Sequence, residues 1–225
     1  MLENASALRP KLVIVEGIMG SGKSTTVLRT ADRLTAAGFR CVGITEGTTP
    51  HPIRFDWNMP WEEVDLAHLM ESSIAKWRAF IDRISTSETV HIIDGQLFHG
   101  NFTSIFLIEA GKDALRNYVR SVLAAIDPMQ PMLIYFRQND VGDAIRWIAS
   151  QRGNAWVQYQ TDWKLTSPYA IRRGLSGLDG LIELYRDYRA ITDQLFAELD
   201  VPKVSIENSR RDWPKYHAII DHALL

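Results

Sequence analysis

The chain has 225 residues, of which 46% are hydrophobic and 23% are charged, a composition typical of a folded globular protein. Its 25 Lys and Arg residues nearly balance its 27 Asp and Glu residues, so no general basic field exists to hold a polyanion, and we expect neither nucleic acid nor a membrane as partner. The single cysteine, Cys41, excludes an intramolecular disulfide and a cysteine-cluster metal site. No apolar run approaches the roughly 18 residues of a membrane span, and no secretory signal is visible, so we expect a cytoplasmic protein.

The first part of the chain has the pattern of a strand, a helix and a second strand. Residues 11–16 contain a short apolar run rich in branched residues and are bounded by a proline and a glycine, which predicts a buried strand. From Lys23, apolar residues recur at three- and four-residue spacing up to Gly38, which predicts a helix, and residues 39–45 predict a second strand. This unit implies two parallel strands in one sheet.

The same alternation continues to the C-terminus. Further buried strands are predicted at 89–94, 132–136 and 203–206. Helices are predicted over 61–84, 113–126, 141–151, 181–199 and 213–225. Residues 46–60 have the prolines of an irregular loop, and residues 153–180 form a polar, aromatic stretch without clean periodicity. Because no linker or repeat interrupts the pattern, the sequence predicts one doubly wound α/β domain over residues 1–225.

A complete phosphate-binding loop follows the first predicted strand. The sequence from Gly17 to Ser24 matches G-x-x-x-x-G-K-[ST], with a strand before it and a helix starting inside it. In such a loop the backbone N–H groups turn toward phosphate oxygens, the lysine reaches the β- and γ-phosphates, and the serine hydroxyl binds Mg²⁺. The predicted nucleotide-binding residues are Gly17, Gly20, Ser21, Gly22, Lys23, Ser24 and Thr25.

Two carboxylates end predicted strands at the edge of the sheet where a ligand would bind. Asp94 ends a hydrophobic strand and, together with Ser24, is the predicted Mg²⁺ group, although an aspartate before a glycine also suits a simple turn. Glu46 ends the second strand and is the candidate general base for an acceptor hydroxyl, with a surface turn as the alternative.

A phosphate loop does not name a reaction, so several classes of protein compete. A GTPase switch needs an N-K-x-D stretch, and the sequence has none. Leu175-Ser176-Gly177 is similar to part of the signature of a transporter-type ATPase, but there the signature precedes the strand-terminal aspartate, whereas here it follows Asp94.

A small-molecule kinase needs a basic segment late in the chain that closes over the phosphates. Between residues 146 and 173 there are five basic residues and one acidic residue, an excess that the rest of the chain does not show. We therefore predict a lid over residues 152–176, with Arg152 as a catalytic phosphate contact and Arg172 and Arg173 as weaker candidates.

The order of these motifs resembles that of thymidylate kinases and the related deoxynucleoside kinases. The first strand with its phosphate loop, the second strand ending at Glu46, the third ending at Asp94, and the helix ending at Gln151-Arg152-Gly153 are all similar to parts of that family. The resemblance implies a three-layer P-loop NTPase fold with a five-stranded parallel sheet flanked by helices, and transfer of the ATP γ-phosphoryl group.

The sequence also departs from that family. Asp94 is followed by Gly95-Gln96 where the family has an arginine, and the long helix over 61–84 has no arginine at the position that binds substrate phosphate. These losses favour an uncharged or polar acceptor. The candidate acceptor-binding residues are aromatic or neutral: His51, Trp57, Gln96 and His99.

The sequence therefore predicts an ATP- and Mg²⁺-dependent kinase that phosphorylates a hydroxyl of a small metabolite, natural product or nucleoside. Two alternatives stay open: a nucleoside-monophosphate kinase, and a regulatory module that uses nucleotide occupancy as a switch. The apolar stripe of the helix over 61–84 is long enough to pair with a second copy of the chain, so a homodimer stays open beside a position in the core.

Overall fold

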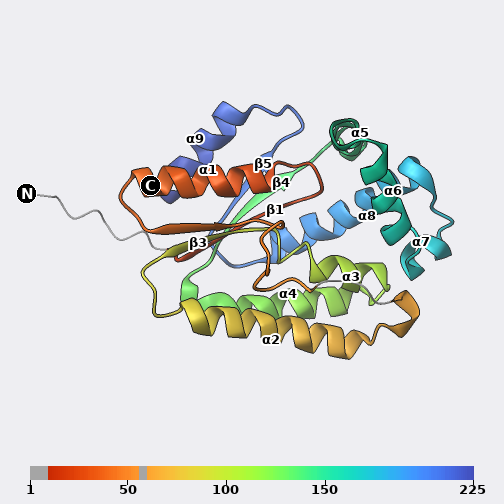
Figure 1. The fold of residues 1–225 in the computed structure, drawn as a ribbon, viewed down its shortest axis with the longest axis horizontal. Coiled ribbons are helices and arrows are strands. Elements are labelled where there is room, and N and C mark those ends of the chain that lie inside the picture. Colours follow the sequence, from red (N-terminus) through yellow and green to blue (C-terminus); the bar gives the residue numbers. More distant parts are fainter. Residues whose placement is uncertain (1–9, 56–59) are drawn as a thin grey trace, which may run out of the picture.

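The computed structural model describes residues 10–55 and 60–225. Five parallel strands form one sheet in the order β2-β3-β1-β4-β5 (Figure 1). Their bounds are β1 (Leu12–Gly17), β2 (Cys41–Ile44), β3 (Val90–Asp94), β4 (Met132–Arg137) and β5 (Lys203–Glu207). In the register of the central strands Val15 pairs with Asp94, so the C-terminal ends of β1 and β3 lie side by side.

Helices cover both faces of the sheet and extend beyond one end of it (Figure 1). They are α1 (Lys23–Ala36), α2 (Leu66–Ile84), α3 (Asn101–Leu107), α4 (Lys112–Ile126), α5 (Val141–Arg152), α6 (Asn154–Lys164), α7 (Pro168–Arg172), α8 (Gly177–Glu198) and α9 (Trp213–Leu224). The 3₁₀ turns are η1 (Trp61–Glu63) and η2 (Asp127–Met129).

Alternating side chains of β1 divide the hydrophobic core into two parts. Leu12 and Ile14 belong to the larger part, which is completed by side chains of α2, α4, α5 and α8. Val13 and Val15 belong to the smaller part, under α1 and α9. A strand that is buried on both faces has a continuous apolar sequence, which is why residues 12–15 are uniformly hydrophobic. The expected three-layer α/β fold with five parallel strands is confirmed.

The differences from the predicted elements lie outside the sheet. The helix predicted over 61–84 begins at Leu66, where the Asp65 side chain accepts the His68 N–H as N-cap. The stretch over 153–180 contains α6, α7 and the first turn of α8, and α3 was not predicted. Every residue of α3 is buried, so this helix has no polar face to give a periodic pattern.

The apolar stripe of α2 packs into the hydrophobic core of the protein. Trp77, Phe80 and Ile81 are buried in the larger core, and α2 packs along α4. None of the helices in the described ranges is long and apolar enough to cross a membrane.

Candidate functional site

The phosphate loop connects the end of β1 to the start of α1. Gly22 precedes α1 with a φ of 86°, in the left-handed region, and a Cβ atom there would lie 2.3 Å from the ring of Trp213. Glycine is therefore required both by conformation and by space. The loop is held from the sheet side, because the Asn208 side chain donates a 2.6 Å hydrogen bond to the Ser21 carbonyl.

The C-terminal end of the loop is formed by Lys23 and Ser24. The Lys23 ammonium donates a hydrogen bond of 3.2 Å to the Ile18 carbonyl, so it points back across the loop. The Ser24 hydroxyl donates to Asp94 Oδ2, while the buried Oδ1 of Asp94 has no hydrogen-bond partner among the described residues. A hydroxyl beside a carboxylate with a spare oxygen fits the oxygen ligands and bridging waters that Mg²⁺ prefers. Among the described residues there is no cluster of three or more histidine, cysteine or acidic side chains to hold a metal without a nucleotide.

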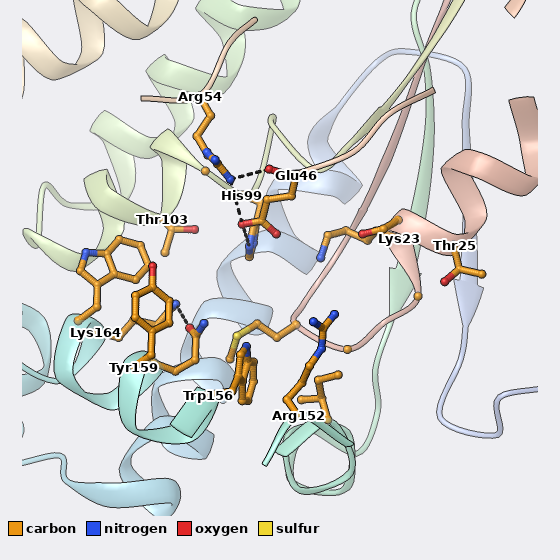
Figure 2. A pocket seen from close by; sticks show the side chains of 18 of the residues that line it. Lys23, Thr25, Glu46, Arg54, His99, Thr103, Arg152, Trp156, Tyr159 and Lys164 are labelled. Carbon is orange, nitrogen blue, oxygen red and sulfur yellow. Dashed lines mark hydrogen bonds and ion pairs between the residues drawn. The ribbon is translucent and has the colours of Figure 1, made fainter. Parts of the chain in front are cut away.

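A cavity of about 750 Å³ opens in front of this loop, and Figure 2 shows it from close by. One end, which we call the donor end, is lined by Gly22, Lys23, Ser24, Thr25 and Arg152. The other, which we call the acceptor end, is lined by the cavity face of α6 together with Phe55, Asn101, Thr103 and Ser104. A cavity of this size is large enough for two small ligands end to end.

Glu46 and His99 line the cavity between its two ends. Glu46 Oε1 lies 3.9 Å from His99 Nε2 and 3.9 Å from an Arg54 guanidinium nitrogen, which also donates to the Glu46 carbonyl at 2.7 Å. The His99 ring when it is protonated, and the permanent charges of Lys23 and Arg54, hold the pKa of the Glu46 carboxyl below its usual range. Burial, with Lys23 adding to it, lowers the pKa of His99, so its imidazole is neutral at physiological pH. An ionised carboxylate therefore stands where the two ends of the cavity meet.

Helix α6 gives the acceptor end most of its wall. Trp156, Tyr159, Gln160, Trp163 and Lys164 all line the cavity, at the three- and four-residue spacing that places side chains on one helix face. The C-terminal end of this helix is fixed by the Trp61 indole, which donates to the Trp163 carbonyl at 3.2 Å and stacks on the Trp163 ring.

The predicted nucleotide-binding residues fall at the donor end or in the loop behind it. Gly20, Gly22, Lys23, Ser24 and Thr25 line the cavity. Gly17 and Ser21 are buried within the loop. Asp94 is buried behind Ser24, and Arg152 reaches the cavity from the end of α5, where Figure 2 shows it pointing toward the loop.

The predicted acceptor-binding residues are brought together only in part. His99 lines the cavity, but among the described residues His51 and Gln96 do not. The His51 ring instead accepts the backbone N–H groups of Ile53 and Arg54, which shapes the loop after β2. Gln96 is buried, with its amide nitrogen 3.5 Å from the Asp94 carbonyl. Trp57 lies outside the described residues.

The basic excess between residues 146 and 173 does not act as one group. Arg172 and Arg173 pair with Glu109, at 3.3 Å for Arg172, and neither lines the cavity. Arg146 faces Asp179 at 3.9 Å. Of the five basic residues, Arg152 and Lys164 line the cavity, because α5 and α6 direct their end residues toward it.

Three residues of the site were not singled out from the sequence. Arg54 lies in a loop without periodicity, and Asn208 is joined to the phosphate loop only by the fold. Lys164 was counted in the basic excess but not distinguished from its neighbours. The helical spacing from Trp156 to Lys164 was the one pattern that would have placed it with the aromatic side chains.

A buried carboxyl group lies under the site in β1. Glu16 is fully buried, and its Oε1 accepts the N–H groups of Leu97 and Phe98 at 2.7 and 3.0 Å. Burial raises the pKa of Glu16 to about 7, against the opposing effects of these hydrogen bonds and of Lys23. Glu16 therefore joins the phosphate-loop strand to the segment after β3.

Comparison with known proteins identifies the fold. No protein-family model matches the chain, and no curated protein sequence matches it significantly. Among solved structures, thymidylate kinase from Ehrlichia chaffeensis is 14% identical, with a TM-score of 0.54 over 95% of this chain and 97% of that one. The YorR protein from Bacillus subtilis, solved with phosphorylated GDP, is also 14% identical, with a TM-score of 0.45 over 94% and 95% of the two chains.

The chain therefore has the P-loop NTPase fold, with the phosphate loop after the central strand of a five-stranded parallel sheet. More particularly, it has the arrangement of that fold found in thymidylate kinase, as its motifs led us to expect. At 14% identity this likeness concerns the fold alone.

Proposed function

We propose that this protein is an ATP- and Mg²⁺-dependent kinase that transfers the γ-phosphoryl group to a hydroxyl of a small acceptor. The observation that carries the proposal is the position of Glu46, which lines one cavity together with the phosphate loop and with the aromatic face of α6. A regulatory switch needs a nucleotide site, but it does not need a second binding region that meets the phosphate loop at a carboxylate.

At the donor end, each residue has a role that suits its chemistry. The loop N–H groups and Lys23 hold the β- and γ-phosphates, and Arg152 compensates the charge of the transferred group. Ser24 and Asp94 would hold Mg²⁺, which when bound would neutralise phosphate charge. Catalysis then depends mainly on positioning and charge stabilisation.

At the junction, Glu46 holds the acceptor hydroxyl in line with the γ-phosphorus. The acceptor oxygen forms a bond to that phosphorus, the bond to the β,γ-bridging oxygen breaks, and ADP leaves with the bond's electron pair. The hydroxyl proton passes to Glu46. The neutral His99 ring, 3.9 Å from Glu46, does not supply a competing acid.

Acceptor-dependent ATP consumption tests this proposal. ADP release would be measured with panels of nucleosides, nucleoside monophosphates, sugars, sugar acids and amino alcohols. We expect at least one class to raise the rate well above the rate with ATP alone, and the Lys23→Ala variant to show no such stimulation. A rate that no acceptor changes, with tight ATP binding, would instead support the nucleotide switch.

A further inference from the structure

Lys164 is the most deeply buried cation at the acceptor end of the cavity. Its side chain is 3% exposed, and its ammonium donates to the Gln160 side chain and lies 4.2 Å from the centre of the Trp163 ring. The backbone around it is fixed, because the buried Ser167 hydroxyl donates to the Lys164 carbonyl at 2.6 Å and Ser167 also caps α7. A flexible side chain is thus held in one place next to an open cavity.

Among the described residues, the charges that line the cavity do not balance: four cations, Lys23, Arg54, Arg152 and Lys164, face one lining carboxylate, that of Glu46. Lys23 and Arg152 lie at the donor end, where a triphosphate would compensate them, and Arg54 already pairs with Glu46. Within the described part of the chain, Lys164 has no carboxylate within 4 Å and interacts with Glu46 only at longer range.

A buried ammonium without a close counter-ion is costly, so burial lowers the pKa of Lys164 to about 7, with Lys23 adding to the shift and Glu46 opposing it. Such a group binds an anion strongly when one arrives, because the anion removes the cost of keeping the ammonium charged. Gln160 adds to this preference, since its amide oxygen already accepts from Lys164 and its amide nitrogen can donate to the same anion.

We propose that Lys164 is the specificity-determining residue for the acceptor, and that the acceptor carries an anionic oxygen group, a carboxylate or a phosphate monoester, which Lys164 and Gln160 bind beside Trp163. The anionic group lies at the far end of the cavity from the phosphate loop, and the reacting hydroxyl lies near Glu46. This inference rests on the proposed function. It also reverses the expectation of an uncharged acceptor. That expectation rested on the lack of an arginine after Asp94 and at the phosphate-binding position of α2, whereas α6 supplies a different cation to the cavity.

The test measures anion binding to protein whose donor end is already filled. The full chain would be saturated with Mg²⁺ and the non-hydrolysable ATP analogue AMP-PNP, then titrated calorimetrically with inorganic phosphate and, separately, with acetate. We expect phosphate, acetate or both to bind to the wild type. Each anion that binds should do so at least about tenfold more weakly to Lys164→Gln. Phosphate binding alone indicates a phosphate monoester, and acetate binding indicates a carboxylate.

Matched variants separate charge from packing. Lys164→Arg keeps the cation and should retain anion binding, whereas Arg172→Gln removes an exposed basic residue that lies outside the cavity and should change nothing. Thermal unfolding of Lys164→Gln, which should not be less stable than the wild type, shows that any lost binding is not lost folding.

The pH dependence gives a second readout. Among the described residues, the titratable and charged groups that line the cavity near Lys164 are Glu46, Lys23, His99 and Arg54. Acetate stays ionised above about pH 6, so its affinity for the wild type should fall as the pH rises above about 7 and Lys164 loses its proton. In Lys164→Arg the affinity should stay constant, because arginine keeps its charge.

Equal anion affinity in the wild type and Lys164→Gln would overturn this inference, as would a loaded wild type that binds neither anion. Both results are obtained on protein saturated with AMP-PNP and without turnover. They are therefore distinct from failure of the proposed function, which would appear as failure to bind AMP-PNP or as ADP release that no acceptor stimulates.

Discussion

The two ends of the cavity are built in different ways. The donor end comes mainly from one contiguous segment, the loop after β1 and the first turn of α1, to which α5 adds Arg152; in the loop, backbone groups and glycines set the geometry. The acceptor end combines side chains from the loop after β2, the segment around α3, and α6. A site made from backbone geometry is constrained to one sequence pattern, whereas a site made from separate side chains is free to change its ligand. We infer that the donor end sets the type of reaction and the acceptor end sets the substrate.

Removing the loop lysine should have the largest effect on this two-ended site. Lys23→Ala deletes the cation that stabilises charge on the transferred group, so kcat/KM should fall by about 10³-fold or more. Steady-state ADP release measures it. Lys11→Ala, which breaks an exposed ion pair with Glu88, is the control and should leave the rate unchanged. A Lys23→Ala variant with near wild-type turnover would exclude the donor end from catalysis.

Neutralising the carboxylate of Glu46 should show that catalysis and nucleotide binding depend on different residues. Glu46→Gln keeps the size of the side chain but cannot accept the hydroxyl proton, so kcat should fall by about 10²-fold while the affinity for AMP-PNP changes little. Turnover assays and calorimetric titration measure the two quantities. An unchanged kcat would show that Glu46 is not the base, and a parallel loss of nucleotide affinity would place it at the donor end.

Two arginines of the predicted lid, Arg152 and Arg172, should differ in their effect on turnover. Arg152 lines the cavity and Arg172 does not, so Arg152→Gln should lower kcat by about tenfold, the effect of one hydrogen bond to a charged group, while Arg172→Gln should not. Side-by-side kinetics of the two variants decide between them. Equal losses would mean that α6 and α7 move to bring Arg172 into the site.

Substitution of Glu16 should have the smallest effect on activity, because this residue acts on the stability of the fold. Its pKa is about 7 in the folded protein and about 4.5 when unfolded, so between these values the folded state holds the proton more tightly and its stability falls as the pH rises. The loss is on the order of 3 kcal/mol across this window.

Glu16→Gln should remove that part of the pH dependence, since the amide oxygen still accepts from Leu97 and Phe98 but does not ionise. Urea unfolding at about pH 5 and about pH 8 should therefore show the variant gaining stability relative to the wild type at the higher pH. The same stability difference at both values would mean that Glu16 titrates normally.

How far the sequence could predict the molecule depends on how local each feature is. The phosphate loop is contiguous, and Asp94 ends a strand whose partner could be inferred from parallel pairing, so both fall at the expected edge of the sheet. The centre of the sheet was predictable because β1, β3 and β4 are short, mainly apolar runs between turn residues.

The acceptor end was less predictable. The position of Lys164 depends on the phase of α6 within a stretch that mixes polar and aromatic residues, and Arg54 depends on a proline-rich loop. His51 was expected to bind substrate, but its ring orders the loop that carries Arg54. These contacts join segments far apart in the chain, and a single sequence carries no pattern that relates them.

The most direct test of the two-ended site is the fate of labelled phosphate. Wild-type protein would be incubated with ATP labelled at the γ-phosphate and a pool of hydroxylated carboxylic acids and phosphate monoesters, and the products separated. The account predicts that the label moves to an organic acceptor, and that Glu46→Gln suppresses this transfer while still binding AMP-PNP. Label that appears only as inorganic phosphate, at a rate independent of the pool, would contradict it.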